Sequence, residues 1–550
     1  MKKMLRNKIE SALKKIAPAG AGQLNFKNIV VEEPKDPAHG HLATNAAMVL
    51  AKPLGLKPRD LACKIIGFMD NSEGFIQSAE AAGPGFINFR LSLEWWTYAL
   101  NEIRNKGSDY GRLEPGGQKV QVEYVSANPT GPLHVGHGRG AALGDCLARI
   151  LAFTGRTVVR EYYINDAGRQ MRVLGQSVLI RLNELKGEET NFPGDHYQGR
   201  YIIDLAGELL NHPGELPANF WDLSKEEKIQ WLSRWAGRRI LDGIKNDLAD
   251  FRAILDVWFS EQSLYDQNLV DEALASLRRG GHIYDQDGAV WFRSEPLGDD
   301  KNRVLIKSNG DKTYLAADVA YHRNKFRHGF DLVVDVWGAD HHGYIPRMEA
   351  AVEALGYRRE QLAVVLVQLV TLLRNGQPVS MSTRSGEFVT LREVLDEVGV
   401  DAARFMFLTR SHESALDFDL EVAKAKNRDN PVYYVQYVCA RIFSLIQKAD
   451  LKDGKPDLSL LTEPEEADLI RHLAGFPDTV ESAARRLEPH LLTAWLTNAA
   501  RLFHQYYGRH RLIEEKQPEL TRARLALAAA VRLVTASGLN LLGVSAPEKM

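Results

Sequence analysis

Cysteine is scarce in this sequence. The three cysteines, Cys63, Cys146 and Cys439, lie far apart and form no CxxC pair. A disulfide framework needs paired cysteines, and a cysteine-rich zinc site needs them at close spacing, so both are excluded. This usage is typical of a protein that works in a reducing compartment, and we expect the cytoplasm.

Long hydrophobic runs are also missing. The segment from Met1 to Ile16 is basic and carries a charge every two or three residues, so it lacks the apolar stretch of a signal peptide. We find no run of about 18 apolar residues that could span a bilayer. Neither export nor a membrane anchor is predicted.

The chain also lacks an excess of charge of either sign. The chain has 69 Lys+Arg against 71 Asp+Glu, a net charge of −2. Proteins that coat nucleic acid indiscriminately are polycations, so this class is excluded, and a nucleic-acid partner would have to bind local basic patches. Residues 1–112 hold 16 Lys+Arg against 11 Asp+Glu, a net +5, which allows a phosphate-facing patch but also fits an ordinary solvated surface.

What the chain does contain is typical of a large globular protein. With 550 residues, 45% apolar and 25% charged, it is too long for one hydrophobic core. Its length fits three or four domains at roughly 150 residues each. We expect three: a small α/β domain at 1–112, an α/β domain at 113–390 and a helical bundle at 391–550.

The middle domain begins with a pattern of strand, glycine-rich loop, helix and strand. Residues 120–124 alternate apolar and polar side chains, as in a half-buried strand. A helix is predicted at 141–153 and a second strand at 157–164. This βαβ unit predicts a parallel, Rossmann-like sheet. We interpret the polar, tryptophan-containing stretch at about 185–300 as a helical insertion between two halves of that sheet.

The last part of the chain is almost entirely helical in pattern. Thr390 and Glu393 form a capping box that would start its first helix. Farther on, an apolar stripe keeps helical spacing and is expected to be core; its residues are Leu492, Trp495, Leu496, Ala499 and Phe503.

Residues 126–140, SANPTGPLHVGHGRG, carry the strongest functional signal. His134 and His137 flank Gly136 where a strand turns into a helix. The N–H groups and the positive dipole end of a helix start bind anions, and imidazole donors can stabilise charge on a phosphate in a transition state. Two other interpretations stay open: a zinc pair, which has no third ligand at a fitting spacing, and plain helix capping.

The same loop resembles the HIGH signature of class I aminoacyl-tRNA synthetases. With VEYV (122–125) before it and EYYINDAGRQ (161–170) after it, the region is similar to bacterial arginyl-tRNA synthetases. The similarity continues in TYLAADVAYH (313–322), WGADHHGYIPRM (337–348), MSTRSG (381–386), NPVYYVQY (430–437) and LGVSAP (542–547). These segments occur in the family's order. The resemblance implies a multidomain protein with a small N-terminal α/β domain, a Rossmann-like catalytic domain and an α-helical anticodon-binding bundle.

The resemblance also implies an arginine pocket. A guanidinium is a planar cation, so selecting it over lysine needs carboxylates placed for paired hydrogen bonds. The family uses an acid five residues before the Asn of the loop and a Tyr-x-x-x-Asp pattern. The matching arginine-binding residues here, with His137 from the loop, are Glu123, Asn128, His137, Tyr314 and Asp318. Taken alone, each acid would also fit a solvent-facing charge.

ATP is the second substrate that the resemblance implies, with Mg²⁺ accompanying the nucleotide and no protein-bound metal. His134, Gly136 and His137 would bind its phosphates, and the two histidines would be catalytic because they stabilise the transition state at the α-phosphate. Gly338 and Asp340 follow a predicted strand and would line the ATP site near the adenosine.

The second class I signature, KMSKS, is degenerate here. The aligned residues 380–384 read SMSTR, so both lysines that bind the ATP phosphates are lost. Met381 and Ser382 keep their places in the ATP site, and we expect Arg384 to be the catalytic cation. Adenylate formation draws negative charge onto the departing pyrophosphate, and a cation must meet it there.

Two surfaces resemble tRNA-binding regions of the family. Asp401–Arg404 is similar to the signature of the DALR anticodon-binding domain. Near the C-terminus cations and aromatics mix, which suits phosphates and unstacked bases, and Tyr506 and Arg509 are the expected tRNA contacts. In the N-terminal domain Phe86 would stack on a D-loop nucleotide and Asn88 would hydrogen-bond to it. A solvated face is the alternative for both surfaces.

The resemblance therefore predicts a cytoplasmic, monomeric enzyme that uses ATP, L-arginine and tRNA(Arg). Arginine would form an adenylate with release of pyrophosphate, and the terminal ribose of the tRNA would then take the arginyl group. In-line attack of the arginine carboxylate on the α-phosphate needs no protein nucleophile. The rivals are a synthetase for another amino acid and a catalytically silent, synthetase-like tRNA-binding protein.

Overall fold

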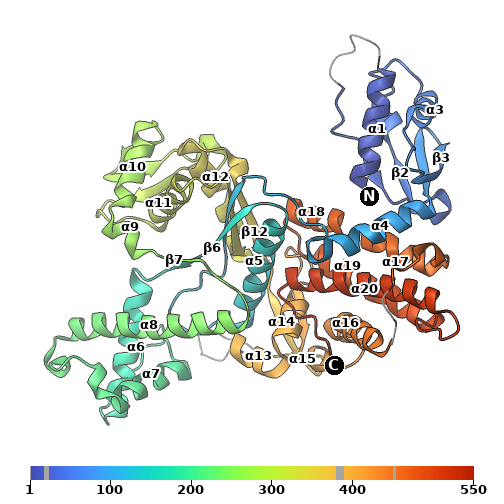
Figure 1. The fold of residues 1–550 in the computed structure, drawn as a ribbon. Helices are drawn as coiled ribbons and strands as arrows, with labels where there is room; N and C mark the ends of the chain where they lie inside the picture. The colour runs from blue at the N-terminus through green and yellow to red at the C-terminus, as the bar shows by residue number, and fades with distance from the viewer. Residues whose placement is uncertain (1, 18–23, 380–388, 450–453) are drawn as a thin grey trace.

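The chain forms three regions that pack on one another (Figure 1). The computed structural model describes residues 2–17, 24–379, 389–449 and 454–550. A small N-terminal domain, drawn in blue, and a central region built on a parallel sheet both contact an orange-to-red helical bundle. This arrangement confirms the predicted three-part architecture.

The N-terminal domain packs helices on a four-stranded antiparallel sheet of order β1-β2-β4-β3. Its elements are α1 (Lys2–Ile16), β1 (Val31–Glu32), β2 (Leu42–Thr44), α2 (Ala46–Leu50), α3 (Pro58–Phe68), β3 (Ile76–Ala82), β4 (Phe86–Leu91) and α4 (Leu93–Lys106). Alternation along β4 buries Ile87, Phe89 and Leu91 and turns Phe86 and Asn88 to the opposite face. The predicted small α/β domain is confirmed.

A five-stranded parallel sheet of order β12-β11-β5-β6-β7 forms the central region. Its strands are β5 (Lys119–Glu123), β6 (Thr157–Ile164), β7 (Val257–Ser260), β11 (Leu332–Gly338) and β12 (Leu362–Val367). Helices α5 (Val135–Phe153), α11 (Tyr314–Arg327) and α12 (Ile345–Ala354) connect them. Because strand order reverses between β5 and β11, ligands are expected at the carboxyl ends of these two strands. The predicted Rossmann-like sheet is confirmed.

The stretch at about 185–300, interpreted from the sequence as a helical insertion, contains strands as well as helices. Strand β7 lies inside that range and pairs with β6 in the main sheet. Helices α6 (Arg169–Leu185), α7 (Arg200–Asn211) and α8 (Lys225–Asp250) precede it, and α9 (Gln262–Asp266), α10 (Leu269–Arg279), β8 (Ile283–Gln286), β9 (Ala289–Phe292) and β10 (Arg303–Ile306) follow it (Figure 1). A strand of four residues shows too little alternation to stand out in the sequence.

A second small sheet follows the main one. It contains β13 (Val370–Arg374), β14 (Gln377–Pro378) and β15 (Leu416–Asp419), and β13 runs parallel to β15. The sequence pattern after Thr390 is almost entirely helical, and it did not indicate the four-residue strand β15. Its neighbours are helical: α13 (Leu391–Val398), α14 (Val400–Phe407) and α15 (Leu420–Lys424). Helix α13 begins at the predicted capping box, where Thr390 Oγ1 accepts from the Glu393 backbone N–H at 3.1 Å.

The C-terminal bundle consists of α16 (Pro431–Lys448), α17 (Pro464–Ala474), α18 (Phe476–Arg486), α19 (His490–Arg509) and α20 (Pro518–Leu541). The apolar stripe predicted on α19 is buried from Leu492 to Phe503, as expected of a core. Helix α20 also contacts α16, α17 and α19, so it lies at the centre of the bundle.

One helix reaches the apolar content of a membrane span. Within the described residues, α20 is long and apolar enough to cross a membrane by length and composition, with a mean hydropathy of 1.2. Even so, α20 is not an unbroken apolar run, because Arg524 and Arg532 interrupt it. Of the most apolar 18 residues of α20, 67% are buried inside the structure, as expected for a helix in the core of a helical bundle.

The segment Asp401–Arg404 joins the central region to the bundle. The fully buried Arg404 guanidinium donates to Asp145 of α5 at 2.5 Å and to the backbone oxygens of Phe251 and Leu542 at 2.9 and 2.8 Å. Asp401 accepts from Arg252 at 2.6 Å, beside the end of α8. These two side chains therefore fix three parts of the chain relative to one another.

Candidate active site

The two histidines of the glycine-rich loop lie at the N-terminus of α5. His134 is the N-cap residue, and its Nδ1 accepts from the backbone N–H groups of Gly136 at 3.1 Å and His137 at 3.4 Å. Nδ1 of His137 in turn accepts from the backbone N–H of His134 at 3.3 Å. The rings stack with centroids 3.6 Å apart. The histidines thus cap the helix, as one of the open interpretations holds.

These contacts also set the positions of the ring protons. A ring nitrogen that accepts from an N–H group carries no proton, so each neutral ring carries its proton on Nε2. Burial lowers the pKa of both rings, and burial together with the neighbouring His134 lowers the pKa of His137 to about 3. Both rings are therefore neutral near pH 7 and have an Nε2–H donor. Two such donors at a helix start suit a phosphate.

The loop is tied to the residues that follow the degenerate second signature. The backbone N–H of Leu391 donates to the oxygen of Leu133 at 2.7 Å, and the N–H of Val135 donates to the oxygen of Val389 at 3.4 Å. This short antiparallel contact places Val389 beside the histidines. The predicted ATP-binding residues Met381, Ser382 and Arg384 lie outside the described residues.

Glu123 is the middle member of a row of three acids. Strand register places Asp335, Glu123 and Glu161 side by side on β11, β5 and β6, and all three are buried. The Lys325 ammonium donates to Glu123 Oε2 at 2.5 Å and to Asp335 Oδ1 at 2.7 Å. Glu123 Oε1 accepts from the Ser126 hydroxyl at 2.8 Å. Both oxygens of Glu123 therefore have partners within the chain, and its predicted contact with arginine stays a prediction.

Two other carboxyl groups lie above this row. Asp318, one turn after Tyr314 on α11, accepts a hydrogen bond from the Tyr344 hydroxyl, and burial raises its pKa. Burial, aided by the charge of Asp318, raises the pKa of Glu261 to about 7. Tyr314, at the start of α11, is 66% exposed. Asp318 and Glu261 are therefore two neighbouring carboxyl groups that are hard to ionise without a cation.

Glu261 is a further candidate site residue, to which no sequence pattern pointed. It directly follows Ser260, the last residue of β7, just as Glu123 is the last residue of β5. An acid at the carboxyl end of a parallel strand is the signal that could have found it. The sequence pattern did not indicate β7, so it did not indicate the acid at the end of that strand either.

Asn128 follows a strained turn at the end of β5. Val125 and Ser126 have φ angles of 70° and 41°, a region that a β-branched residue such as Val125 rarely adopts. The Asn128 Nδ2 group donates to Gln170 Oε1 at 2.6 Å. The amide oxygen of Asn128 is then the atom that would accept from a substrate ammonium group.

Gly338 and Asp340 lie where β11 ends, beside β5. A Cβ atom on Gly338 would lie 2.5 Å from Asp340 Oδ1, a contact that rotation of the Asp340 side chain would relieve. The Asp340 side chain is 81% exposed. Both predicted ATP-binding residues are therefore at the carboxyl edge of the sheet, where a nucleotide is expected in this fold.

The predicted tRNA contacts differ in their accessibility. Phe86 is 37% exposed and shares the outer face of β4 with Asn88. Tyr506 is fully buried, and its hydroxyl donates to the buried Glu466 at 2.9 Å. The prediction that Tyr506 contacts tRNA is therefore wrong, because a base cannot reach its ring. Arg509 is exposed and forms an ion pair with Glu465.

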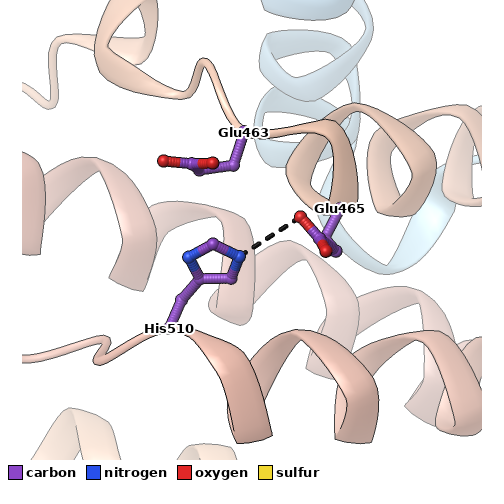
Figure 2. A group of neighbouring side chains, drawn as sticks. All are labelled: Glu463, Glu465 and His510. Carbon is purple, nitrogen blue, oxygen red and sulfur yellow. Dashed lines mark hydrogen bonds and ion pairs between the residues drawn. The ribbon is translucent and has the colours of Figure 1, made fainter.

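One group of side chains has the composition of a metal site (Figure 2). Glu463, Glu465 and His510 each offer a ligand atom, and these atoms lie within 4.8 Å of one another. Arg509 already binds Glu465 and is the largest cause that lowers its pKa to about 2, so we interpret the group as an ion-pair cluster. Within the described part of the chain, no third ligand completes a metal group with His134 and His137.

Three family models match the chain in the order of the three regions. They are described as "Arginyl tRNA synthetase N terminal domain", over residues 3–91, "tRNA synthetases class I (R), catalytic domain", over 100–426, and "DALR anticodon binding domain", over 435–550. The catalytic model alone covers more than half of the chain.

Curated and solved relatives agree with these models. An arginine–tRNA ligase of Desulfosudis oleivorans is 51% identical over 561 residues, which cover 100% of both chains. One of Nitratidesulfovibrio vulgaris is 51% identical and covers 94% of this chain and 95% of its own. The structure of Thermus thermophilus arginyl-tRNA synthetase superposes with a TM-score of 0.79 at 25% identity, covering 100% of both chains. The chain therefore belongs to the arginyl-tRNA synthetase family, the class I arginine–tRNA ligases.

Proposed function

We propose that the protein activates L-arginine with ATP to arginyl-adenylate, releasing pyrophosphate, and then transfers arginine to the 3′ end of tRNA(Arg). Family membership supports the reaction. The observation that supports arginine as the amino acid is the pair of neighbouring acids, Asp318 and Glu261, whose raised pKa values a bound cation would lower.

The guanidinium group would lie between these two carboxylates. It is planar, always charged and carries five N–H donors, so it can pair with two carboxylates at once, whereas an ammonium group has only three donors at one point. The Tyr344 hydroxyl orients Asp318 from the side. Glu123 would act from below, as part of the buried acidic row that makes this end of the pocket electronegative.

The α-amino group of the substrate would bind at Asn128, between the acidic pocket and the histidine loop. The Gln170 side chain holds the amide nitrogen of Asn128 at 2.6 Å and so fixes which end of the amide is the acceptor. This position leads the substrate carboxylate toward the N-terminus of α5. There it can attack the α-phosphate of ATP in line.

His134 and His137 would stabilise the charge that develops on the α-phosphate. Their neutral Nε2–H groups are donors that need no change of protonation during the reaction, and the helix N-terminus adds its positive end. ATP would enter as its Mg²⁺ complex, with Gly338 and Asp340 near the adenosine. No covalent intermediate with the protein is needed, because positioning and charge stabilisation supply the rate.

Arg384 would provide the positive charge that the lost lysines of the second signature supply elsewhere. Its segment leads into Val389 and Leu391, which are tied to the histidine loop. Replacement by alanine should slow adenylate formation and leave arginine affinity unchanged. Single-turnover kinetics at saturating ATP test this, and a wild-type rate in Arg384→Ala would contradict it.

The tRNA would contact both the N-terminal domain and the bundle. Phe86 and Asn88 offer an exposed ring and an amide on one strand face. In the bundle, a pocket of about 500 Å³ is large enough for an unstacked base; its lining residues are Thr409, Tyr434, Thr493, Ala494, Thr497, Asn498 and Arg501. With the ring of Tyr434 and the guanidinium of Arg501, this pocket can stack and hydrogen-bond a base. We expect a cytoplasmic monomer.

Arginine-dependent exchange of pyrophosphate into ATP, measured with and without tRNA(Arg), tests this function. Exchange should require arginine and should not occur with lysine or citrulline. Exchange with another amino acid would reveal a different synthetase. Binding of tRNA without exchange and without aminoacylation would reveal a catalytically silent tRNA-binding protein.

A further inference from the structure

We propose that Lys325 is a positioning residue of the arginine site. Through Glu123 and Ser126 it holds the strained turn that carries Asn128. The inference rests on the arginine pocket proposed above. The side chain of Lys325 is buried, so its proposed role does not depend on contact with the substrate.

The first step of the argument is the setting of Lys325. The side chain is 1% exposed, and its ammonium group lies between Glu123 Oε2 at 2.5 Å and Asp335 Oδ1 at 2.7 Å. It also lies 4.3 Å from the ring centroid of Tyr321, whose hydroxyl donates to Glu161. Lys325 is thus enclosed by the acidic row and one helix, which leaves no room for a substrate.

The second step is the link from Lys325 to the turn. With Oε2 of Glu123 fixed by Lys325, Oε1 accepts from the Ser126 hydroxyl at 2.8 Å. The same hydroxyl accepts from the backbone N–H of Tyr163 at 3.1 Å. Residues of β5 and β6 therefore both hold Ser126. The contact with β5 forms only when the Glu123 carboxylate keeps its orientation.

The third step is the cost of the turn. Val125 and Ser126 both have positive φ angles, 70° and 41°. Such backbone is unfavourable for residues other than glycine and persists only where the surroundings determine it. Glu123 provides that restraint from the strand before the turn. If its carboxylate rotates or takes up a proton, the turn can relax toward negative φ and carry Asn128 with it.

Lys325 is the reason that Glu123 keeps its orientation. Three acids on neighbouring strands repel one another, and a buried carboxylate that loses its cation is protonated or moves. Asp335 has a second partner in His322, at 2.8 Å, whereas Glu161 is held by Tyr321. Removing Lys325 should therefore disturb Glu123 most. A displacement of about 1 Å at a substrate contact can cost on the order of a hundredfold in rate.

The test compares Lys325→Met with a control, Arg327→Met. Arg327 lies on the same helix, and its partner Glu272 is exposed. L-arginine and ATP binding are measured by calorimetry on the full chain. We expect Lys325→Met to weaken arginine binding at least about tenfold and to leave ATP binding within about twofold. Arg327→Met should change neither. Hydrogen exchange of residues 124–128 in the ligand-free protein should become faster only in Lys325→Met.

A strain-relieving substitution separates positioning from general damage. Val125→Gly removes the cost of the positive φ angle, so in the Lys325→Met background it should restore most of the arginine affinity. A merely structural loss would not be restored at this position. If Lys325→Met does not fold, Ser126→Ala removes the other contact of Glu123, the one from the Ser126 hydroxyl. It should also weaken arginine binding, and Val125→Gly should again restore the affinity.

Normal arginine affinity in folded Lys325→Met, or in Ser126→Ala, would overturn the proposal. So would a loss of arginine affinity that Val125→Gly does not restore. Failure of the proposed function looks different, because the wild-type protein itself would then bind no arginine. In that case unchanged hydrogen exchange at 124–128 in Lys325→Met would still refute the positioning role.

Discussion

The guanidinium of Arg404 and the carboxylate of Asp145 form an ion pair in which both side chains are 0% exposed. Arg404 belongs to α14 and Asp145 to α5, the helix that begins at the two histidines of the candidate active site. Arg404 also binds backbone oxygens at the end of α8 and after α20. The helix that presents the phosphate site is thereby fixed to the bundle by one side chain.

Replacing Arg404 by methionine should destabilise the protein strongly. The change leaves the Asp145 carboxylate buried with only Arg149 as a partner and two backbone oxygens without their donor. Breaking a buried pair in this way costs about 3–5 kcal/mol. A thermal melt should show a clearly lower Tm. Arg278→Met, which removes an exposed pair with Asp285, is the control and should stay within about 1 kcal/mol of wild type.

Replacing His137 by alanine should slow adenylate formation by on the order of a hundredfold, the usual effect of losing one donor to a developing charge. Arginine affinity should hardly change, because the ring acts at the phosphate. Single-turnover formation of the adenylate measures the rate. Because the pKa of His137 is lowered to about 3, no step in the rate between pH 5 and 8 should come from this ring.

The zinc interpretation of the two histidines makes the opposite prediction. Stoichiometric zinc in the purified protein, or rescue of His137→Ala by added zinc, would contradict the donor role. A metal chelator should leave the wild-type protein's arginine affinity unchanged.

Glu261 should make arginine binding depend on pH. Its pKa is raised to about 7 in the folded protein, mainly by burial, and only the ionised form pairs well with a guanidinium. Arginine affinity should therefore rise by roughly tenfold between pH 6 and pH 8. Calorimetry across this range measures it, and Glu261→Gln should bind weakly with no such rise.

Glu261 should also make the stability of the protein depend on pH, but stability should fall as pH rises, whereas arginine affinity should increase. Between its unfolded value of 4.5 and its folded value of about 7, Glu261 holds a proton in the native state that the unfolded chain releases. The free energy of unfolding in the absence of arginine should therefore fall as pH rises through this window. Glu261→Gln should lose that part of the slope, and an unchanged slope would show that Glu261 ionises normally.

Much of this architecture could be predicted because local patterns agree with the fold. The alternation at 120–124 and the helix pattern at 141–153 locate the first strand and helix of the parallel sheet, and the histidine loop lies between them. Strand β7 could not be found in this way, and Glu261 was lost with it. Its four residues form an edge strand whose identity depends on pairing with β6, a contact between distant parts of the chain.

Tyr506 shows a different limit. The buried stripe of α19 reaches Phe503, and continuing its spacing by three residues leads to Tyr506. The spacing of the stripe is thus consistent with the buried position, whereas the mixture of cations and aromatics around Tyr506 led to the prediction of a tRNA contact. Its hydroxyl is satisfied inside the bundle by Glu466, which also accepts from Arg524 at 3.1 Å. Such a buried polar pair becomes visible only in three dimensions.

Phe86 and Tyr506 should therefore respond differently to substitution. Phe86→Ala removes an exposed ring and should raise KM for tRNA(Arg) with little change in Tm, since base stacking on an aromatic ring is worth about 1–3 kcal/mol. Tyr506→Phe removes a buried hydrogen bond and should lower stability by about 1 kcal/mol with no effect on KM for tRNA. Aminoacylation kinetics and thermal melts measure both, and the reverse pattern would contradict these placements.

The central claim is that Asp318 selects the guanidinium of arginine, and Asp318→Asn tests it most directly. The substitution keeps the shape of the side chain and removes its charge. Calorimetric titration with L-arginine should show a loss of roughly 1.5–3 kcal/mol, the value of a charge-assisted hydrogen bond, while ATP binds as in the wild type. Normal arginine affinity in Asp318→Asn would contradict the claim and place the pocket elsewhere.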